Sequence, residues 1–204
     1  DFEERLSKEF EAVGFFISNH PLNQYKEVFK DYKIIDFQSF NNNDDSKEGN
    51  IAATLLKIQE RKTAKGNAYA VIKLTDLSSV FELFVFSDIL DINREILTEG
   101  NSFILRIIKS TLNIENRFRR INVRKISSLK ELINKPISEV TFELCSIDQV
   151  NEISKFLPEN GETLIKINIQ DKKEDLFFVL ENRRNIDRKT INLLRNKQIS
   201  AIIN

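Results

Sequence analysis

The feature that most constrains the fold is a row of five short apolar segments in the middle of the chain. In residues 68–75 every second side chain is apolar, which is the two-residue period of a β-strand. Ser87 can cap a helix over residues 88–97, after the third segment. The five expected strands cover residues 51–59, 68–75, 80–86, 102–109 and 117–126.

Three strands, one helix and two strands over about 75 residues are the plan of the OB fold, a five-stranded Greek-key barrel. In that fold the helix plugs one end of the barrel. Two alternatives remain from the pattern: an SH3-like barrel, which lacks the helix, and an open α+β sheet. We expect the OB-fold barrel, preceded by a short helical segment.

The residues before the barrel follow a helical period. Gly14 predicts the end of a first helix, and Pro21 predicts the start of a second, because a missing N–H costs nothing there. Residues 41–49 are polar and turn-rich, as in a linker. The apolar face of the first helix consists of Phe2, Leu6, Phe10 and Val13.

The residues after the barrel predict the order βαββαβ, which is the ferredoxin-like or split-βαβ plan. An RNA-recognition module shares this order, but its third strand carries a basic-Gly-aromatic run, and residues 176–180 contain no glycine. We therefore favour a small α+β domain that docks a protein. The expected elements cover residues 140–145, 148–157, 163–169, 176–180, 187–196 and 199–203.

The expected domains differ in charge. A helical segment and linker (1–49) hold 6 Lys/Arg against 11 Asp/Glu, and the C-terminal docking domain (128–204) is balanced. The OB-fold domain (50–127) holds the positive excess, with 13 basic against 8 acidic residues up to residue 126. A local basic excess is typical of a segment that meets phosphate, and it is equally compatible with an ordinary solvated surface.

An OB fold binds single strands with an exposed sheet face and with the loops after its first and fourth strands. Lys and Arg attract phosphates, and aromatic rings stack on unpaired bases. By residue type Phe81, Phe84 and Phe86 favour the barrel core, and Phe84 is the best exception because it shares a face with Glu82. The residues predicted to bind nucleic acid are Arg61, Lys62, Lys65, Tyr69, Lys73, Phe84, Arg117, Phe118, Arg119 and Arg120.

The sequence offers little for catalysis. His20 is the only histidine and Cys145 the only cysteine, which excludes an internal disulfide and a Cys/His zinc site. His20 favours a capping or hydrogen-bonding role, and Cys145 a place in the core. No phosphate-binding glycine loop and no paired strand carboxylates occur. We expect no catalytic residue, metal or cofactor in this chain.

The cellular setting follows from the same residues. No apolar run reaches the roughly 18 residues that a membrane-spanning helix needs. The single cysteine favours a reducing cytoplasm. The chain contains no Met and opens on charged residues rather than a signal peptide, so we expect a piece of a longer protein.

Residues 9–22 (EFEAVGFFISNHPL) resemble a segment of the alpha subunit of bacterial replicative DNA polymerase III. In that family a Gly-aromatic-aromatic-x-Ser-Gly-His-Pro-Leu run precedes the OB domain, and here Asn19 replaces the second Gly. Residues 65–86 resemble the family's second and third strands, with Ser79 where a Gly is usual. The resemblance is specific over the first 90 residues and rests on element order beyond residue 127.

The resemblance implies a C-terminal region of a DNA-directed DNA polymerase, a nucleotidyltransferase of DNA replication. It implies that the OB domain holds single-stranded template DNA. It also implies that the last domain docks the tau subunit of the clamp loader, with further partners among the polymerase III holoenzyme subunits. The polymerase carboxylates would lie upstream, so the 204-residue chain itself should be inactive.

Two other functions remain open from the residues alone. One is an RNA- or tRNA-binding OB module, which would prefer structured RNA. The other is a protein-interaction scaffold that no longer binds nucleic acid and would bind no oligonucleotide at low salt.

Overall fold

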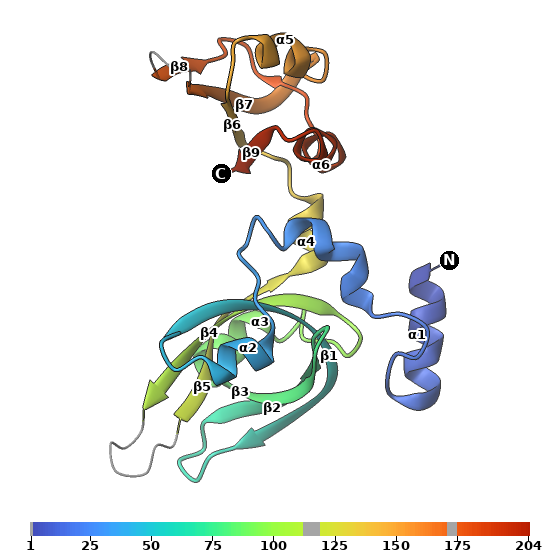
Figure 1. Ribbon diagram of the computed structural model, residues 1–204. Helices are drawn as coiled ribbons and strands as arrows, with labels where there is room; N and C mark the ends of the chain where they lie inside the picture. The colour runs from blue at the N-terminus through green and yellow to red at the C-terminus, as the bar shows by residue number, and fades with distance from the viewer. Residues whose placement is uncertain (1, 112–118, 171–174) are drawn as a thin grey trace. The chain divides into compact units, whose positions relative to one another are not determined.

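The computed structural model describes residues 2–111, 119–170 and 175–204 (Figure 1). Within it the chain forms two compact units, Asp1–Ile133 and Asn134–Asn204. The first unit contains a β-barrel with helices around it, and the second contains a separate sheet with two helices. Each unit has buried clusters of its own.

Five strands close into the barrel of the first unit in the order β1-β2-β3-β5-β4. The longest strand, β1, pairs antiparallel with β2 along one part and with β4 along another. A single parallel pairing between Phe84 and Asn122 joins β3 to β5 and completes the circle. The strands are β1 (Glu48–Lys62), β2 (Ala68–Thr75), β3 (Val80–Phe86), β4 (Ser102–Thr111) and β5 (Arg119–Ser128).

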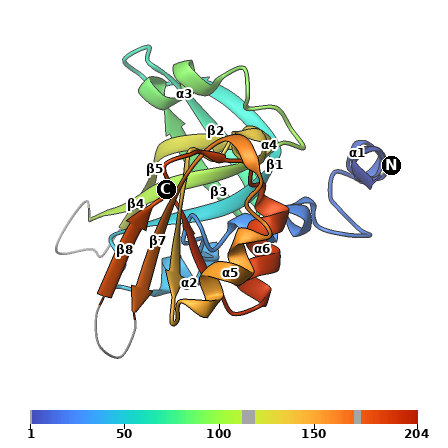
Figure 2. The same ribbon diagram turned by 90° about the horizontal axis from the view of Figure 1, so that it is seen from above.

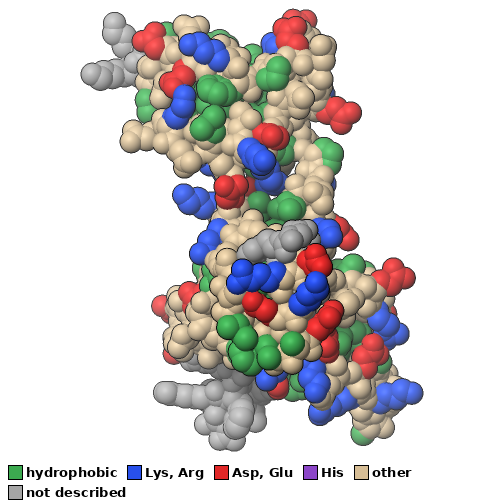
Figure 3. Space-filling view, turned by 90° about the vertical axis from the view of Figure 1, so that its right-hand side faces the viewer, with side chains coloured by type: hydrophobic (Ala, Val, Ile, Leu, Met, Phe, Trp, Pro, Cys, Tyr) green, Lys and Arg blue, Asp and Glu red, His purple; other side chains and the backbone are tan. Residues whose placement is uncertain are grey.

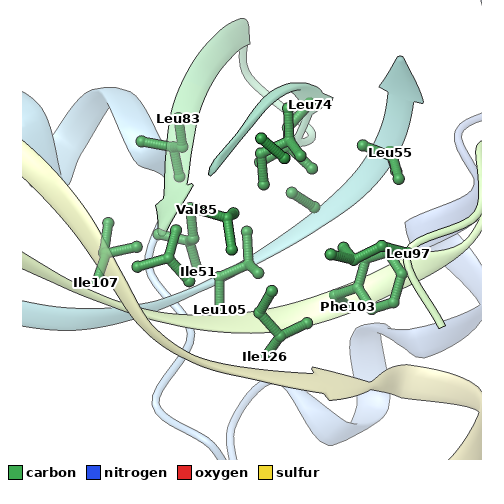
Figure 4. Close-up of a cluster of buried hydrophobic side chains, with 14 of the residues drawn as sticks. Ile51, Leu55, Leu74, Leu83, Val85, Leu97, Phe103, Leu105, Ile107 and Ile126 are labelled. Atoms are coloured by element: carbon green, nitrogen blue, oxygen red, sulfur yellow. The ribbon is translucent and has the colours of Figure 1, made fainter. Parts of the chain in front are cut away.

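Alternation along these strands fills the barrel interior. In β3, Phe81, Leu83 and Val85 are buried while the residues between them face outward. Figure 4 shows Leu83, Val85 and side chains from other strands gathered inside the barrel. A fully buried Leu or Val stabilises the fold by about 1.5–3 kcal/mol, so this interior fixes which side chains remain outside.

Short helices surround the barrel. Between β3 and β4, α3 (Ser87–Asn93) buries Leu90 in the barrel core. A separate small core joins η1 to the barrel exterior, where Leu22 and Tyr25 pack with Ala52 and Ile104. The remaining helical elements are α1 (Phe2–Val13), η1 (Pro21–Val28), α2 (Phe37–Asn42) and α4 (Leu129–Asn134).

The second unit is a four-stranded sheet in the order β8-β7-β6-β9. Its helices contribute to one buried cluster with the inward residues of β6 and β7, and Figure 2 shows α5 and α6 to the right of β7 and β8. Arg195 of α6 donates from Nε and Nη2 to the carbonyl of Ala201, which fixes the helix to β9. The elements are β6 (Glu139–Leu144), α5 (Asp148–Ser154), β7 (Glu159–Gln170), β8 (Asp175–Val179), α6 (Arg188–Asn196) and β9 (Ser200–Ile203).

The second unit has the expected element order but not the expected sheet. In a split-βαβ unit another strand lies between the two parallel strands, whereas here β6 and β7 pair directly in parallel, with Val140 opposite Ile165. The ferredoxin-like prediction is therefore wrong in its strand pairing. The inward rows of β6 and β7 bury Ile165, Ile167 and Ile169 beside Val140 and Phe142, which makes the two strands natural neighbours.

Smaller differences lie at the element ends. The element that begins at Pro21 is a 3₁₀ helix, and β7 begins at Glu159, four residues before the expected strand 163–169. The expected linker 41–49 includes the end of α2 and the start of β1. The strands β2 and β3 have the predicted bounds.

Candidate nucleic-acid interface

Aromatic side chains gather on the outer face of the barrel, where β2 and β3 lie side by side. Phe84 is 39% exposed, and the centroid of its ring lies 6.3 Å from that of Tyr69, with 35° between the ring planes. Phe86, half-buried, lies directly opposite Tyr69 in the strand register. We call Tyr69, Phe84 and Phe86 the aromatic platform.

Cations flank the aromatic platform on two sides. The guanidinium carbon of Arg120, on β5, lies 4.7 Å from the ring centroid of Phe86 and 5.5 Å from that of Phe84. Arg61, on β1, is opposite Tyr69 in the register and is exposed, and its Nη2 donates to Oε1 of Gln59 at 2.8 Å. A guanidinium over ring faces, as at Arg120, combines attraction to the rings with N–H donors that suit phosphate.

The turn between β1 and β2 carries more positive charge. Lys62 and Lys65 are exposed there, and Gly66 adopts a φ of +84°, which favours glycine. The backbone N–H of Thr63 donates to the carbonyl of Asn67 at 2.9 Å and closes the turn. Both lysines therefore extend from an ordered hairpin beside Arg61.

The structure brings together four of the predicted residues in one region: Arg61, Tyr69, Phe84 and Arg120. Arg117 and Phe118 lie outside the described residues, and for Arg119 only the backbone pairing with Thr111 is described. Lys73 is exposed on the outward face of β2, four residues along the strand from Tyr69. The assignment of all ten residues to nucleic-acid binding stays a prediction.

Sequence reasoning missed one member of the aromatic platform and one residue beside it. Phe86 was expected in the core, yet it is only half-buried and contacts Arg120. Asn122, paired with Phe84, donates from Nδ2 to Oγ of Ser110 at 3.0 Å, while its buried Oδ1 accepts no hydrogen bond from the described residues. The alternation along β3, which puts Phe84 and Phe86 on one face, was the available signal for Phe86.

The N-terminal motif holds the segment before the barrel in place. His20 caps η1, because its Nδ1 accepts from the backbone N–H of Leu22 at 3.1 Å, and its Nε2 lies 3.3 Å from Oγ1 of Thr75 on β2. Burial lowers the pKa of His20, with a smaller lowering by Lys26 and an opposing effect of Asp76. The predicted capping role of His20 is confirmed.

A second contact orders the loop between α1 and η1. The carboxylate of Glu9 accepts from the backbone N–H groups of Ile17 and Ser18 at 3.1 and 3.0 Å. Hydrogen bonds from the side chain and backbone of Ser18 lower the pKa of Glu9 to about 2. Gly14, at a φ of +76°, donates its N–H to the carbonyl of Phe10 and ends α1 as predicted.

Other chemistry has little support in the described ranges. No group of three or more His, Cys, Asp or Glu side chains gathers there as a metal site. Cys145 is exposed, so its predicted place in the core is wrong: it follows the inward-facing Leu144 at the end of β6. No described helix has the length and apolar character needed to cross a membrane.

The surface around α1 differs from the aromatic platform. On the side of the molecule in Figure 3, positive and negative side chains alternate, with hydrophobic side chains between them. On α1 itself Lys8 pairs with Glu4 at 2.7 Å and Arg5 with Glu9 at 3.5 Å. Surface ion pairs within one helix of this kind contribute little to stability.

Fold and surface together define a class: a small closed barrel with an aromatic and cationic outer face, followed by a separate α+β unit. Curated proteins similar to this chain share one name, DNA polymerase III subunit alpha. The protein of Rickettsia conorii is 29% identical over 161 residues, which is 78% of this chain and 12% of that protein. That of Aquifex aeolicus is 22% identical over 208 residues, covering 97% of this chain and 18% of the relative.

The similarity is strongest over a shorter stretch. The protein of Rickettsia bellii is 40% identical over 82 residues, which is 39% of this chain and 7% of the relative. No protein-family profile matches the chain. The chain is therefore similar, over most of its length, to a region of bacterial DNA polymerase III alpha subunits, and it spans 12–18% of the length of the relatives that match most of it.

Proposed function

We propose that this chain is a region of a DNA polymerase III alpha subunit whose barrel binds single-stranded template DNA. The observation that carries the proposal is the aromatic platform, with the exposed ring of Phe84 and with Arg120 over Phe84 and Phe86. Single strands expose base faces and phosphates together, and a surface of rings and cations attracts both. Similarity to proteins named DNA polymerase III subunit alpha supports DNA as the nucleic acid.

The barrel belongs, in this proposal, to the OB class. Its strand order β1-β2-β3-β5-β4, with α3 between β3 and β4, agrees with a five-stranded Greek-key barrel that carries one helix. OB folds use the face of their second and third strands and the loop after the first strand. Tyr69, Phe84 and the turn with Lys62 and Lys65 occupy those places.

Phe84→Ala tests the site at its most exposed ring. Each base stacked on an aromatic ring contributes about 1–3 kcal/mol, so we expect the Kd for fluorescent oligo-dT to rise between roughly 5- and 150-fold. The side chain lies on the outside of the barrel, so the unfolding temperature should change little. Fluorescence anisotropy across a salt series measures the Kd.

Ile92→Ala provides the control, because Ile92 is an apolar side chain on α3 that is 81% exposed. It should leave the Kd unchanged. Equal affinity of the Phe84 and Ile92 variants would contradict the assignment of Phe84. A wild-type preference for structured RNA would favour the RNA-binding alternative, and no binding at low salt would favour a scaffold.

We infer for the second unit a role in docking the tau subunit of the clamp loader. Its edge strand β8 exposes Phe177, Phe178 and Val179, of which Phe177 is 59% exposed. Exposed apolar clusters of this kind mark interaction surfaces.

Phe177→Ser with Val179→Ser should abolish co-purification with tau from the same organism, whereas Leu193→Ser on α6 should not. Retained binding by the double variant would remove β8 from the interface.

The parent protein is, in this proposal, a DNA-directed DNA polymerase, and the 204-residue chain does not polymerise by itself. Primer extension by the isolated chain above background would overturn this second statement.

A further inference from the structure

A second candidate site lies in the first unit, at some distance along β1 and β2 from the aromatic platform. There the N-terminal helical elements and the barrel wall line a half-open cavity of about 730 Å³. Residues of α1 and η1 line it on one side, and β1, β2 and the turn before β4 line it on the other. Neither the barrel class nor the aromatic platform accounts for this cavity.

Three lysines converge on the cavity: Lys57, Lys73 and Lys130. All three are exposed, and none forms an ion pair within the described part of the chain. Lys57 and Lys73 lie directly opposite each other across β1 and β2. Like charges in that position destabilise a sheet, and Lys73 has one carboxylate, Glu82, opposite it on β3, so an anion beside Lys57 would add a second neutralising charge.

A β-bulge aims one of these lysines at the cavity. The register of β1 shifts between Leu55 and Lys57, and Leu56 is the extra residue, which also lines the cavity. Bulges bend a strand locally and redirect a side chain, and they are common beside functional sites. The bulge lies in β1 only, so it redirects the side chain of Lys57 without changing the direction of Lys73 on β2.

Two carboxylates also line the cavity, and they do not neutralise it. Glu99 accepts the backbone N–H of Ile58 at 3.2 Å, so its carboxylate is held by the barrel wall. Glu11 comes from the opposite side, on α1. Three lysines against two carboxylates leave a positive site.

Aromatic and apolar side chains form the rest of the lining. The rings of Phe10 and Phe16 stack with centroids 5.1 Å apart, and both line the cavity together with Tyr25. Lysines beside rings suit a ligand with phosphates and planar groups, which is the chemistry of a nucleotide chain. A small inorganic anion would use only the lysines.

The strand register connects the cavity to the aromatic platform. Arg61 faces Tyr69, and Lys57 faces Lys73, four residues further along β2. At about 3.3 Å per residue the two pairs are about 13 Å apart, which is the length of about four stacked nucleotides at about 3.4 Å each. One strand can therefore reach both places on the same outer face.

We propose that this cavity binds backbone phosphates of the single strand whose bases stack on the aromatic platform, through Lys57, Lys73 and Lys130. The proposal rests on the proposed function of the barrel. It adds that the bound strand extends from the aromatic platform towards α1. It makes the helical segment before the barrel one wall of the nucleic-acid path.

The test uses the whole chain, a length series of oligo-dT from 3 to 15 nucleotides chosen on the basis of about 3.4 Å per nucleotide, and the double variant Lys57→Gln, Lys130→Gln. On the shortest oligonucleotides, which fill only the platform, the variant should bind as the wild type does. On the longest ones its Kd should rise about tenfold. Each lost phosphate contact should also reduce the slope of log K against log salt by about 0.7.

Lys155→Gln with Lys189→Gln is the matched control, because it removes the same charge from exposed lysines of the second unit. Equal losses in both double variants would mean a general charge effect and overturn the proposal. The proposal would also be overturned if Lys57→Gln with Lys130→Gln had the same Kd as the wild type at every oligonucleotide length. Phe84→Ala weakens binding at all lengths if the barrel function is right, so the failure of the cavity leaves that function standing. No wild-type binding at any length overturns both.

Discussion

At the scale of single residues, the segment before the barrel depends on one imidazole. His20 uses both ring nitrogens: Nδ1 accepts from Leu22 and Nε2 contacts Thr75. This arrangement requires the neutral ring with its proton on Nε2, because a protonated Nδ1 accepts nothing. The same residue thus ends a loop, begins η1 and joins it to β2.

The pKa of His20 predicts how this contact responds to acid. Burial lowers the pKa below its ordinary value of 6.5, so the unfolded chain binds the proton more readily than the folded one. The free energy of unfolding should therefore fall as the pH drops below about 6.5. Thermal unfolding of the first unit between pH 7.5 and pH 5 measures it.

The variant His20→Gln separates this effect from general acid sensitivity, because Gln keeps an acceptor and does not titrate. It should be less stable than the wild type at pH 7.5 by about 1 kcal/mol, the usual contribution of a helix cap. The difference should shrink towards pH 5. A constant difference across this range would contradict the role of the neutral ring.

At the scale of elements, a buried carboxylate joins α2 to the barrel. Asp76, in the turn between β2 and β3, is 5% exposed. Its Oδ2 accepts the N–H of Phe37 at 2.7 Å, and its Oδ1 accepts those of Ser78 and Ser79. At the other end of α2, Lys109 donates to the carbonyls of Asn41 and Asn43 and to that of Phe40.

Asp76→Ala should destabilise the first unit by about 3 kcal/mol, because three backbone N–H groups lose their acceptor at once. Urea unfolding monitored by circular dichroism measures the loss. Asp45→Ala, at an exposed loop position, should change stability by less than about 0.5 kcal/mol. Similar midpoints for the two variants would show that α2 does not depend on Asp76.

At the scale of the whole molecule, the two units are expected to unfold separately. Their buried clusters share no residue. All three tyrosines, Tyr25, Tyr32 and Tyr69, lie in the first unit. Tyrosine fluorescence therefore follows the first unit alone, while circular dichroism follows both.

Gly161→Ala should destabilise only the second unit. A Cβ at this position would overlap the backbone of Arg184 and Asn185, and such a clash costs about 1–3 kcal/mol or more. The circular dichroism transition of the second unit should move to lower temperature while the tyrosine transition stays in place. A shift of both would mean that the units unfold together.

Across the whole molecule, the elements that the sequence predicted are those with an unbroken local pattern, and the ones it missed depend on distant residues. The strands β2 and β3 were predicted to the residue, because their alternation is unbroken from Ala68 to Thr75 and from Val80 to Phe86. The helix α2 was missed although Asp36 caps it locally, because its other contacts come from Asp76 and Lys109, far along the chain. The pairing of β6 with β7 was missed because local periodicity does not specify which strands become neighbours.

The candidate site shows the same division. Alternation identified Phe84 as the exposed ring, because it shares a face with Glu82. The stacking of Arg120 over Phe84 and Phe86 depends on how β5 meets β3 across the closure of the barrel, and no local pattern contains that pairing.

The alternation of side chains along β1 limits how the surface around Arg61 can change in evolution. Gln59 and Arg61 lie two residues apart and face outward, while Ile58, the residue before Gln59, packs against the barrel core. Insertion of one residue into this part of the strand would turn Arg61 inward and present its neighbour to solvent. Natural variants of this hairpin should therefore gain or lose residues in pairs, or change length only at the tip near Gly66.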